Sequence, residues 1–499
     1  MSDFLLFDAF IEGLIQVLSF PAFGFMLVGM LIGFVVGLLP GLGGATTLAL
    51  MLPFIYTMEP ITAFAFLLGM HAVVATTGDI TSVLFGVPGE GTAAATILDG
   101  HPMAKKGEAG RALGAALFSS LAGAVIGAFF LAAAIPFVRP LVLSFGSPEM
   151  FMLIVLGVTF ISALGGGSML KAFLAGLLGL LIAMVGQDPQ MGIYRYTFGW
   201  LYLFDGLPLI PAVIGLFAVP EIVDLAVSRG AISGDAPGKL GGVWQGVKDT
   251  VIHWGLTIRC SLLGTFIGFI PGLGGAVAQW VAYGHAVQSS KHPELFGTGM
   301  VEGVLAPGAA NNSKEGGSLI PTVAFGVPGS AAMAILLGAF LILGLTPGPD
   351  MVGKHVVVTF SMVWTLVVAN VITVALALLF LNQIARITQI RGGILVPVLI
   401  LLIFLGGFAA KNNIGDLVSV VLFGFLGVAM MKLNWPRPPM VLGIVLGGLA
   451  ENYLFISTQR YGATFLGRPI VIIIMVFIVG AILWPMWQER RKKAKRQLS

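Results

Sequence analysis

The stretch Gly-Leu-Leu-Pro-Gly-Leu-Gly-Gly-Ala at residues 37–45 recurs as Gly-Phe-Ile-Pro-Gly-Leu-Gly-Gly-Ala at residues 268–276, with seven of nine positions identical. A second motif, Phe-Gly-Val-Pro-Gly, occupies residues 85–89 and again residues 325–329. Both motifs return in the same order, which is the mark of an internal repeat. The sequence therefore predicts a chain built from two related halves, with a repeat of about 200 to 230 residues.

The composition places these motifs in a membrane protein. Of the 499 residues, 57% are apolar and 10% are charged, against roughly 45–50% and about 25% in soluble domains. Mean hydropathy is +1.00, and apolar runs such as residues 394–408 lack the alternation of a membrane-spanning strand. At about 20 residues per crossing, the length accommodates roughly 10 to 14 membrane-inserted helical elements. The predicted fold is an all-α polytopic membrane protein.

A polar stretch near the middle of the sequence divides the chain. We predict a first transmembrane repeat at residues 1–227, a cytoplasmic linker at 228–249, a second repeat at 250–456, and an extra helix with a basic tail at 457–499. Basic residues favour the cytoplasmic side. They are concentrated around the linker and in the tail, and the first 104 residues contain none. If the linker and the tail are both cytoplasmic, an even number of crossings separates them, and one of these crossings is the extra helix. The second repeat, and by analogy the first, then crosses the membrane an odd number of times. This predicts two inverted repeats and a periplasmic N-terminus.

Several function classes lack their signatures. The single cysteine, Cys260, excludes intrachain disulfides and cysteine-based metal sites. The basic tail suits anionic lipid of the bilayer, so no nucleic-acid partner is expected. The six histidines show no metal-ligand spacing, and no phosphate loop, HExxH or Ser-His-Asp pattern occurs. No enzyme activity and no cofactor are predicted, and the only metal considered is a bound Na⁺.

The repeated motifs interrupt apolar spans and predict broken helices and re-entrant hairpins. Backbone groups freed at membrane depth need partners in protein, water or a ligand. A helix that starts after such a break directs free N–H groups at an anion, and freed carbonyls suit Na⁺. Close helix packing is the alternative explanation for each glycine. The predicted substrate-binding residues are Gly41, Gly43, Gly44, Thr46, Thr47, Pro88, Gly89, Gly272, Gly274, Gly275, Asn311, Asn312, Pro328 and Gly329.

Polar residues near the Phe-Gly-Val-Pro-Gly motifs are candidates for coupling to an ion, because ionisable groups inside a membrane are costly and often functional. These candidates are Asp79, Thr81, Ser82, Glu315 and Ser318. Three alternatives stay open. Lys314 can neutralise its neighbour Glu315 as an ion pair, the histidines near the motifs can serve packing, and Asn311 and Asn312 can cap a half-helix. The sequence does not distinguish Na⁺ from H⁺ as the coupling ion.

At these motifs the chain resembles the large membrane subunit (TctA) of the bacterial tripartite tricarboxylate transporters. The resemblance rests on residues 37–45, 85–89, 99–110, 271–276, 310–313, 319–321 and 325–329. It implies a multi-pass protein of the bacterial inner membrane and a secondary, ion-coupled carrier. It also implies a small four-helix membrane subunit and a periplasmic solute-binding protein as partners. Because Gly308, Lys314 and Glu315 depart from the family pattern, the expected substrate is an organic acid anion. A channel for small anions is the alternative, although the twofold repeat within one chain favours a carrier.

Overall fold

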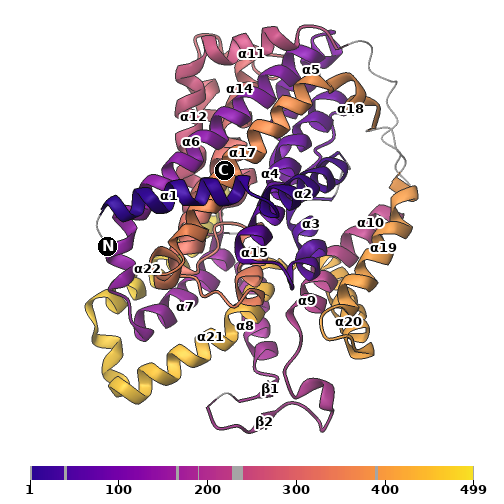
Figure 1. The fold of residues 1–499 in the computed structure, drawn as a ribbon. Helices are drawn as coiled ribbons and strands as arrows, with labels where there is room; N and C mark the ends of the chain where they lie inside the picture. The colour runs from indigo at the N-terminus through magenta and orange to yellow at the C-terminus, as the bar shows by residue number, and fades with distance from the viewer. Residues whose placement is uncertain are drawn as a thin grey trace.

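A computed structural model describes residues 3–38, 42–164, 168–188, 190–227, 240–387 and 392–497. Most of these residues form helices. The strands among them, β1 (Gly186–Gln187) and β2 (Tyr194–Arg195), pair in a short antiparallel hairpin that projects from one end of the helical body (Figure 1). The predicted all-α fold class is confirmed.

The helices of the first half are α1 (Asp3–Leu18), α2 (Ala22–Gly37), α3 (Gly44–Met51), η1 (Leu52–Ile55), α4 (Pro60–Phe85), η2 (Gly91–Ala93), α5 (Ile97–Lys105), α6 (Ala109–Leu143), α7 (Ser147–Leu164), α8 (Met169–Ala183), η3 (Leu201–Leu203), α9 (Leu209–Val213), η4 (Ile214–Ala218) and α10 (Val219–Val227).

Those of the second half are α11 (Val243–Ile252), α12 (Trp254–Phe269), α13 (Gly274–Ser289), η5 (Pro293–Leu295), α14 (Glu302–Phe325), α15 (Ala331–Ile342), α16 (Pro349–Val352), α17 (Val356–Leu379), α18 (Leu381–Ile387), α19 (Gly392–Phe408), α20 (Ile414–Lys432), α21 (Pro438–Tyr461), η6 (Gly462–Gly467) and α22 (Pro469–Gln497). Within the stretch that the sequence assigns to the linker, α11 begins at Val243 and packs along α6.

Six of the described helices are long and apolar enough to cross a membrane, and eight spans result if each of two bent pairs counts as one. Leu6–Leu18 and Ala22–Gly37 bend by 65°, and Val243–Ile252 and Trp254–Phe269 bend by 80°. Pro21 lies at the first bend, where its missing N–H interrupts the helical ladder. Further apolar helices of 10 to 17 residues accompany these spans, as expected of a polytopic membrane protein with broken helices.

Glycines bring α2 and α4 into direct contact. A Cβ added at Gly33 would lie 2.5 Å from the carbonyl oxygen of Met70, and one added at Gly37 would lie 2.9 Å from the Cα atom of Val74. Only residues without a Cβ allow helices to approach this closely.

The same contacts recur between α12 and α14. Gly264 packs in this way against Ala310, at 2.8 Å from its Cα atom, and Gly268 packs against the backbone of Lys314. The two glycines lie 231 positions after Gly33 and Gly37, and their partners lie 240 positions after Met70 and Val74. The repeat seen in the sequence is therefore also a repeat of helix packing.

Helices α4 and α14 form the centre of the molecule. Every residue from Thr62 to Val83 of α4 and from Gly303 to Ala324 of α14 is buried. They are surrounded by α2, α6, α12 and α17. Because α4 and α14 carry many polar side chains, the burial of both helices concentrates polar chemistry in the middle of an apolar protein.

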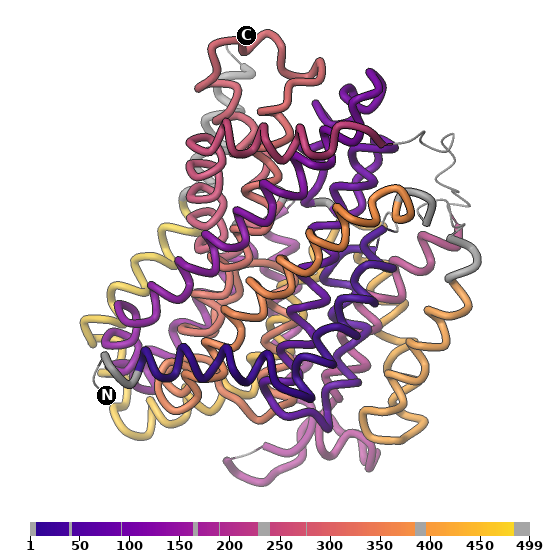
Figure 2. The backbone as a smooth tube through the Cα atoms, turned by 45° about the horizontal axis from the view of Figure 1, so that its top comes forward, coloured from indigo at the N-terminus to yellow at the C-terminus, as the bar shows by residue number. Residues whose placement is uncertain are grey.

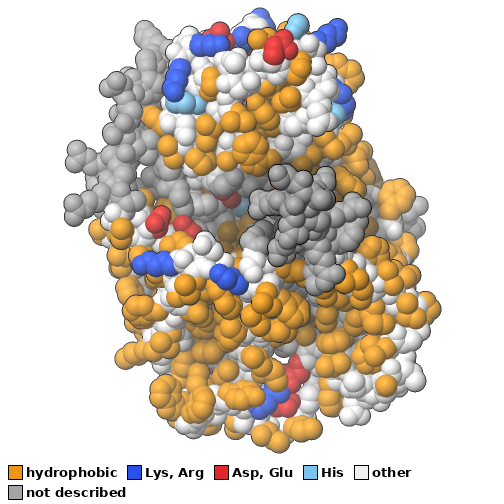
Figure 3. Space-filling view, turned by 180° about the vertical axis from the view of Figure 1, so that it is seen from behind, with side chains coloured by type: hydrophobic (Ala, Val, Ile, Leu, Met, Phe, Trp, Pro, Cys, Tyr) orange, Lys and Arg blue, Asp and Glu red, His pale blue; other side chains and the backbone are white. Residues whose placement is uncertain are grey.

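Much of the surface is apolar. Figure 3 shows hydrophobic side chains over much of one face, charged side chains gathered along its upper edge, and smaller charged groups at mid-height on the left and near the lower end. The hairpin lies at one end of the molecule and α5 and α11 lie at the opposite end (Figures 1 and 2). This distribution is typical of a protein whose middle is covered by lipid.

Candidate functional site

Both central helices end at a glycine in the left-handed region. Helix α4 ends at Phe85 and is followed by Gly86 with φ +67°, and α14 ends at Phe325 and is followed by Gly326 with φ +67°. A side chain is strained in this conformation, and a proline two residues later cannot continue a helix. The repeated Phe-Gly-Val-Pro-Gly motif is thus a helix stop in both halves.

After each stop, the last glycine of the motif returns to the helix that precedes the Pro-Gly-Leu-Gly-Gly motif. A Cβ added at Gly89 would lie 2.9 Å from the carbonyl oxygen of Gly37, and one added at Gly329 would lie 2.7 Å from that of Gly268. Ser318 Oγ also donates a hydrogen bond of 3.2 Å to the Gly268 carbonyl. These contacts bring the two motifs of each half together.

The carboxylate of Glu90 occupies the start of α3. This helix begins at Gly44, whose backbone N–H donates a hydrogen bond of 3.2 Å to Glu90 Oε1. A Cβ at Gly44 would collide with the imidazole of His71, so the glycine lets both side chains reach the helix. A negative charge is stabilised at this position by the helix dipole and the free N–H groups.

Helix α13 starts in the corresponding place but in different surroundings. Gly275 packs against the aliphatic stem of Lys314, and a Cβ added there would lie 2.5 Å from Lys314 Cδ and 2.6 Å from Thr92 Cγ2. Gln279 lies one turn further on the same face of α13 and is fully buried. The residue at its capping position, Leu273, makes no side-chain hydrogen bond to the helix.

Three charged or ionisable side chains from α4 and α14 meet in the protein interior. His71 Nε2 lies 3.2 Å from Glu315 Oε1, and the Nζ atom of Lys314 contacts the same carboxylate oxygen. Each of the three residues is at most 3% exposed. Burying a charge is costly unless it is paired. In this His71–Lys314–Glu315 cluster, the negative charge of Glu315 is paired with the ammonium of Lys314 and with the imidazole of His71.

A hydrogen-bond network beside this cluster links α4 to α14 and α17. Asn311 Nδ2 donates to the carbonyl of Ala75 at 2.8 Å and to Asp79 Oδ2 at 3.3 Å. Asn312 Nδ2 donates to Thr76 Oγ1 at 2.7 Å and to Asn370 Oδ1 at 2.5 Å.

Both Asn311 and Asn312 lie in the middle of an unbroken α14. The alternative that they cap a half-helix is therefore wrong, because their amides face neighbouring helices and not a helix terminus.

Buried polar atoms without a hydrogen-bond partner among the described residues gather in the same region. Such atoms are rare in native interiors and call for an explanation. No cluster of three or more His, Cys, Asp or Glu suited to a metal ion occurs in the described ranges. The atoms are His71 Nδ1, Glu90 Oε2, Thr92 Oγ1, Gln279 Oε1 and Nε2, Asn311 Oδ1, Asn312 Oδ1 and Glu315 Oε2.

Other predicted site residues have their polar groups satisfied within the protein. Thr47 Oγ1 donates to the Gly43 carbonyl at 3.0 Å. The hydroxyls of Thr81 and Ser82 both donate to the carbonyl of Gly78, at 3.1 and 3.0 Å. Thr46, on the same helix as Thr47, is buried. These side chains stabilise the broken segments.

The remaining predicted residues lie in the backbone around the motifs. Gly272 and Gly274 have φ of +83° and +69°. Gly272 packs closely against Phe160, whereas the space beside Gly274 is open. Pro88 and Pro328 follow the two helix stops. Gly41 lies outside the described residues.

The sequence analysis did not single out Glu90, although it directly follows the first Phe-Gly-Val-Pro-Gly motif. It also missed Thr92 and Asn370, and it favoured packing as the role of His71, one of the histidines near the motifs. The position of Glu90 beside a motif was an available signal. The contact of His71 with Glu315 was not, because it arises only where α4 and α14 cross.

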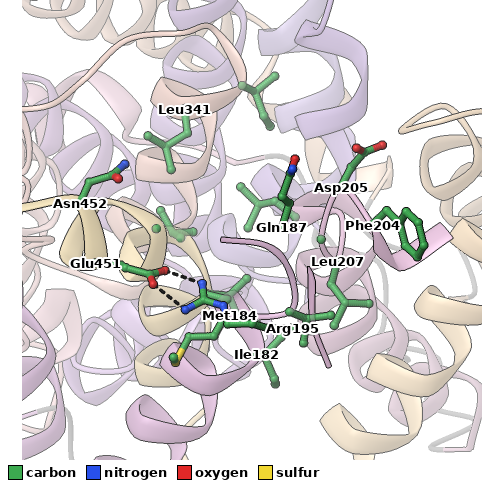
Figure 4. A pocket seen from close by; sticks show the side chains of 18 residues that line it. Ile182, Met184, Gln187, Arg195, Phe204, Asp205, Leu207, Leu341, Glu451 and Asn452 are labelled. Atoms are coloured by element: carbon green, nitrogen blue, oxygen red, sulfur yellow. Dashed lines mark hydrogen bonds and ion pairs between the residues drawn. The ribbon is translucent and has the colours of Figure 1, made fainter. Parts of the chain in front are cut away.

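A second polar pocket lies near the hairpin, with a volume of about 500 Å³. It is lined by the ends of α8 and α15, by the hairpin and by α21 (Figure 4). Arg195 and Glu451 pair within it, and Asp205 lies on its rim (Figure 4). The negative ends of two helices and two carboxylates face a single arginine, which makes this pocket unfavourable for an anion.

The comparison with known families is decisive. Residues 23–442 match the model described as "Tripartite tricarboxylate transporter TctA family". The chain belongs to the tripartite tricarboxylate transporter TctA family. The match includes both copies of each motif, so the His71–Lys314–Glu315 cluster of this TctA-family chain lies within the matched region.

Two relatives come from Agrobacterium vitis. One, described as an uncharacterized 52.8 kDa protein in the TAR-I ttuC' 3' region, is 32% identical over 474 residues and covers 93% of each chain. The other, described as an uncharacterized protein in the TAR-II ttuC' 3' region, is 30% identical over 210 residues, covering 42% of this chain and 87% of the relative. No solved structure matches.

Proposed function

We propose that this TctA-family chain is the large transmembrane subunit of a secondary active, ion-coupled transporter that imports organic acid anions. The site lies between the starts of α3 and α13 and the His71–Lys314–Glu315 cluster. The observation that carries the proposal is the gathering of unpartnered buried polar atoms at the place where these elements meet. Groups of this kind are stabilised when a polar ligand supplies their missing hydrogen bonds.

Coupling to an ion is supported by the carboxylates next to this site. Asp79 is fully buried and accepts hydrogen bonds from Thr96 at 2.8 Å and from Asn311 at 3.3 Å. The free Oδ1 atoms of Asn311 and Asn312 are further oxygen ligands of the type that Na⁺ prefers. Glu315 and Asp79 are the candidates if the ion is H⁺.

The tripartite family supports two partners, a small four-helix membrane subunit and a periplasmic solute-binding protein. We place the chain in the bacterial inner membrane, with the hairpin on the periplasmic side and α5 and α11 on the cytoplasmic side. This orientation is supported by Lys105 and Lys106, which lie at the end of α5.

Uptake measurements test the proposal. Cells that produce the chain with both partners are expected to accumulate radiolabelled organic acids in a saturable manner. Replacing Na⁺ or adding a protonophore identifies the coupling ion, because accumulation stops when the driving gradient is removed. Saturable uptake that persists in both treatments would contradict the ion coupling, and a non-saturating, gradient-independent flux would favour the anion channel instead of a carrier.

A further inference from the structure

The starts of α3 and α13 follow the two copies of one motif, yet they present different chemistry. At α3, the Gly44 N–H is already bonded to a carboxylate of the chain itself, that of Glu90. At α13, the capping position is occupied by Leu273, whose side chain makes no hydrogen bond to the helix.

The start of α13 has the features of a carboxylate site. The Lys314 stem lies against Gly275, which places a cationic side chain beside the helix N-terminus. Gln279, fully buried one turn along the same face, has neither its Oε1 nor its Nε2 atom bonded to a described residue. Side chains on a helix lean towards its N-terminus, so the Gln279 amide is directed to the Gly275 end of α13.

The segment of Glu90 to Thr92 connects the two helix starts. Glu90 Oε1 bonds to α3, and Thr92 packs against Gly275 of α13. Glu90 is also within electrostatic range of both Lys314 and His71. A ligand at the start of α13 therefore lies next to the negative charge of Glu90, whose Oε2 atom has no partner among the described residues.

We infer that Glu90 is a built-in carboxylate that fills the anion position of α3, so that a substrate carboxylate binds at α13 between Lys314 and Gln279. This inference rests on the proposed function and deepens it, because it sets the substrate class. One carboxylate of the substrate is accepted at α13. The part of the substrate facing Glu90 is an uncharged hydrogen-bond donor such as a hydroxyl, since a second carboxylate is repelled there.

Binding of lactate, malate and citrate to the full-length chain in nanodiscs, measured by calorimetry, tests this inference. These hydroxy acids carry one, two and three carboxyl groups. The wild-type protein is expected to bind lactate most tightly. Glu90→Gln removes the charge but keeps the shape, so it is expected to change the ratio of malate to lactate affinity by tenfold or more in favour of malate.

Two further variants test the α13 position and one serves as a control. Gln279→Ala is expected to weaken binding of all three acids by about tenfold, as is the double variant K314M/E315Q, which removes both charges of the Lys314–Glu315 pair together. Glu294→Gln removes an exposed carboxylate on η5 and is expected to change nothing. Gel filtration and thermal unfolding confirm that each variant is folded.

The outcomes separate the inference from the proposed function. An unchanged malate-to-lactate ratio in Glu90→Gln, or unchanged binding in Gln279→Ala, overturns the inference while the carrier proposal stands. If the isolated chain binds too weakly, the same ratios are taken from initial uptake rates of the assembled transporter. Absence of both binding and uptake of every organic acid overturns the proposed function itself.

Discussion

The guanidinium of Arg195 donates two hydrogen bonds, of 2.6 and 2.9 Å, to the carboxylate of Glu451. Arg195 belongs to the hairpin before α9, and Glu451 lies inside α21. Arg437, just before α21, donates in turn to Glu221 of α10 at 2.8 Å. Each arginine thus pairs with an acid of the other half, so the two ion pairs link the two halves.

The Arg195–Glu451 pair is expected to stabilise the fold measurably. Both side chains are less than a quarter exposed, and paired charge-assisted hydrogen bonds are strong. A double-mutant cycle with Arg195→Ala and Glu451→Ala should give a coupling of about 1–2 kcal/mol in the unfolding of the purified protein. The exposed Lys411–Asp205 pair, at 4.0 Å, is the control and should give a coupling near zero. Equal couplings for the two pairs would contradict this interpretation.

Low pH is expected to open the hairpin locally. The backbone N–H groups of Gln190 and Met191 and the charge of Arg195 lower the pKa of Asp188. A lowered carboxyl pKa contributes stability above the unfolded value of about 3.9, and this contribution is lost as the pH falls through the folded value. Hydrogen exchange at Gln190 and Met191 should accelerate in that window. Asp188→Asn should remove the pH dependence, and a persistent dependence would assign it to another group.

Two adjacent glycines are expected to respond differently to alanine. At Gly43, which has φ −76° and ψ 170°, a Cβ meets Glu90 Cγ at 3.4 Å, an ordinary contact. At Gly44, a Cβ collides with the imidazole of His71. Uptake should therefore stay near the wild-type level in Gly43→Ala and fall at least tenfold in Gly44→Ala. Similar uptake in both variants would show that the start of α3 does not need the close approach of His71.

Asn311 and Asn312 are expected to be important for uptake. In each case alanine removes a free Oδ1 atom and leaves buried partners unpaired, which costs about 1–3 kcal/mol of stability. If the amides also bind ligand, uptake should fall tenfold or more at equal amounts of folded protein. Asn382→Ala, which changes an amide bonded to Leu240 outside the site, is the matched control. Loss of stability with unchanged uptake would restrict both residues to a packing role.

The proposed orientation can be tested with introduced cysteines. Cys260 is buried, so the wild-type protein should give little background with an impermeant thiol reagent. Asp205→Cys, at an exposed position near the hairpin, should react from the periplasmic side. Ser289→Cys, at the C-terminal end of α13, should be protected in intact cells. The reverse pattern would invert the topology derived from the basic residues.

The sequence alone determined the class of the protein, its duplication and the places where its helices stop. The hydropathy of a segment depends only on the residues within it, and the effects of glycine and proline on the backbone are local. Membrane-spanning segments and helix ends can therefore be predicted without knowledge of the fold. Thus α4 and α14 end just before Gly86 and Gly326, and α3 and α13 begin at Gly44 and Gly274. All four glycines lie within the repeated motifs.

Only the tertiary structure decided what faces those breaks. Asn311 and Asn312 stand next to each other in the sequence, yet they bond to different partners on α4 and α17. Glu90 reaches Gly44 across 46 positions, and His71 meets Glu315 across the helix crossing. Such contacts depend on the angle and register at which helices pack, and these are set by many weak interactions summed over the whole interior. The near-identical motifs therefore concealed the difference between a helix start bonded to Glu90 and one that lies against the stem of Lys314.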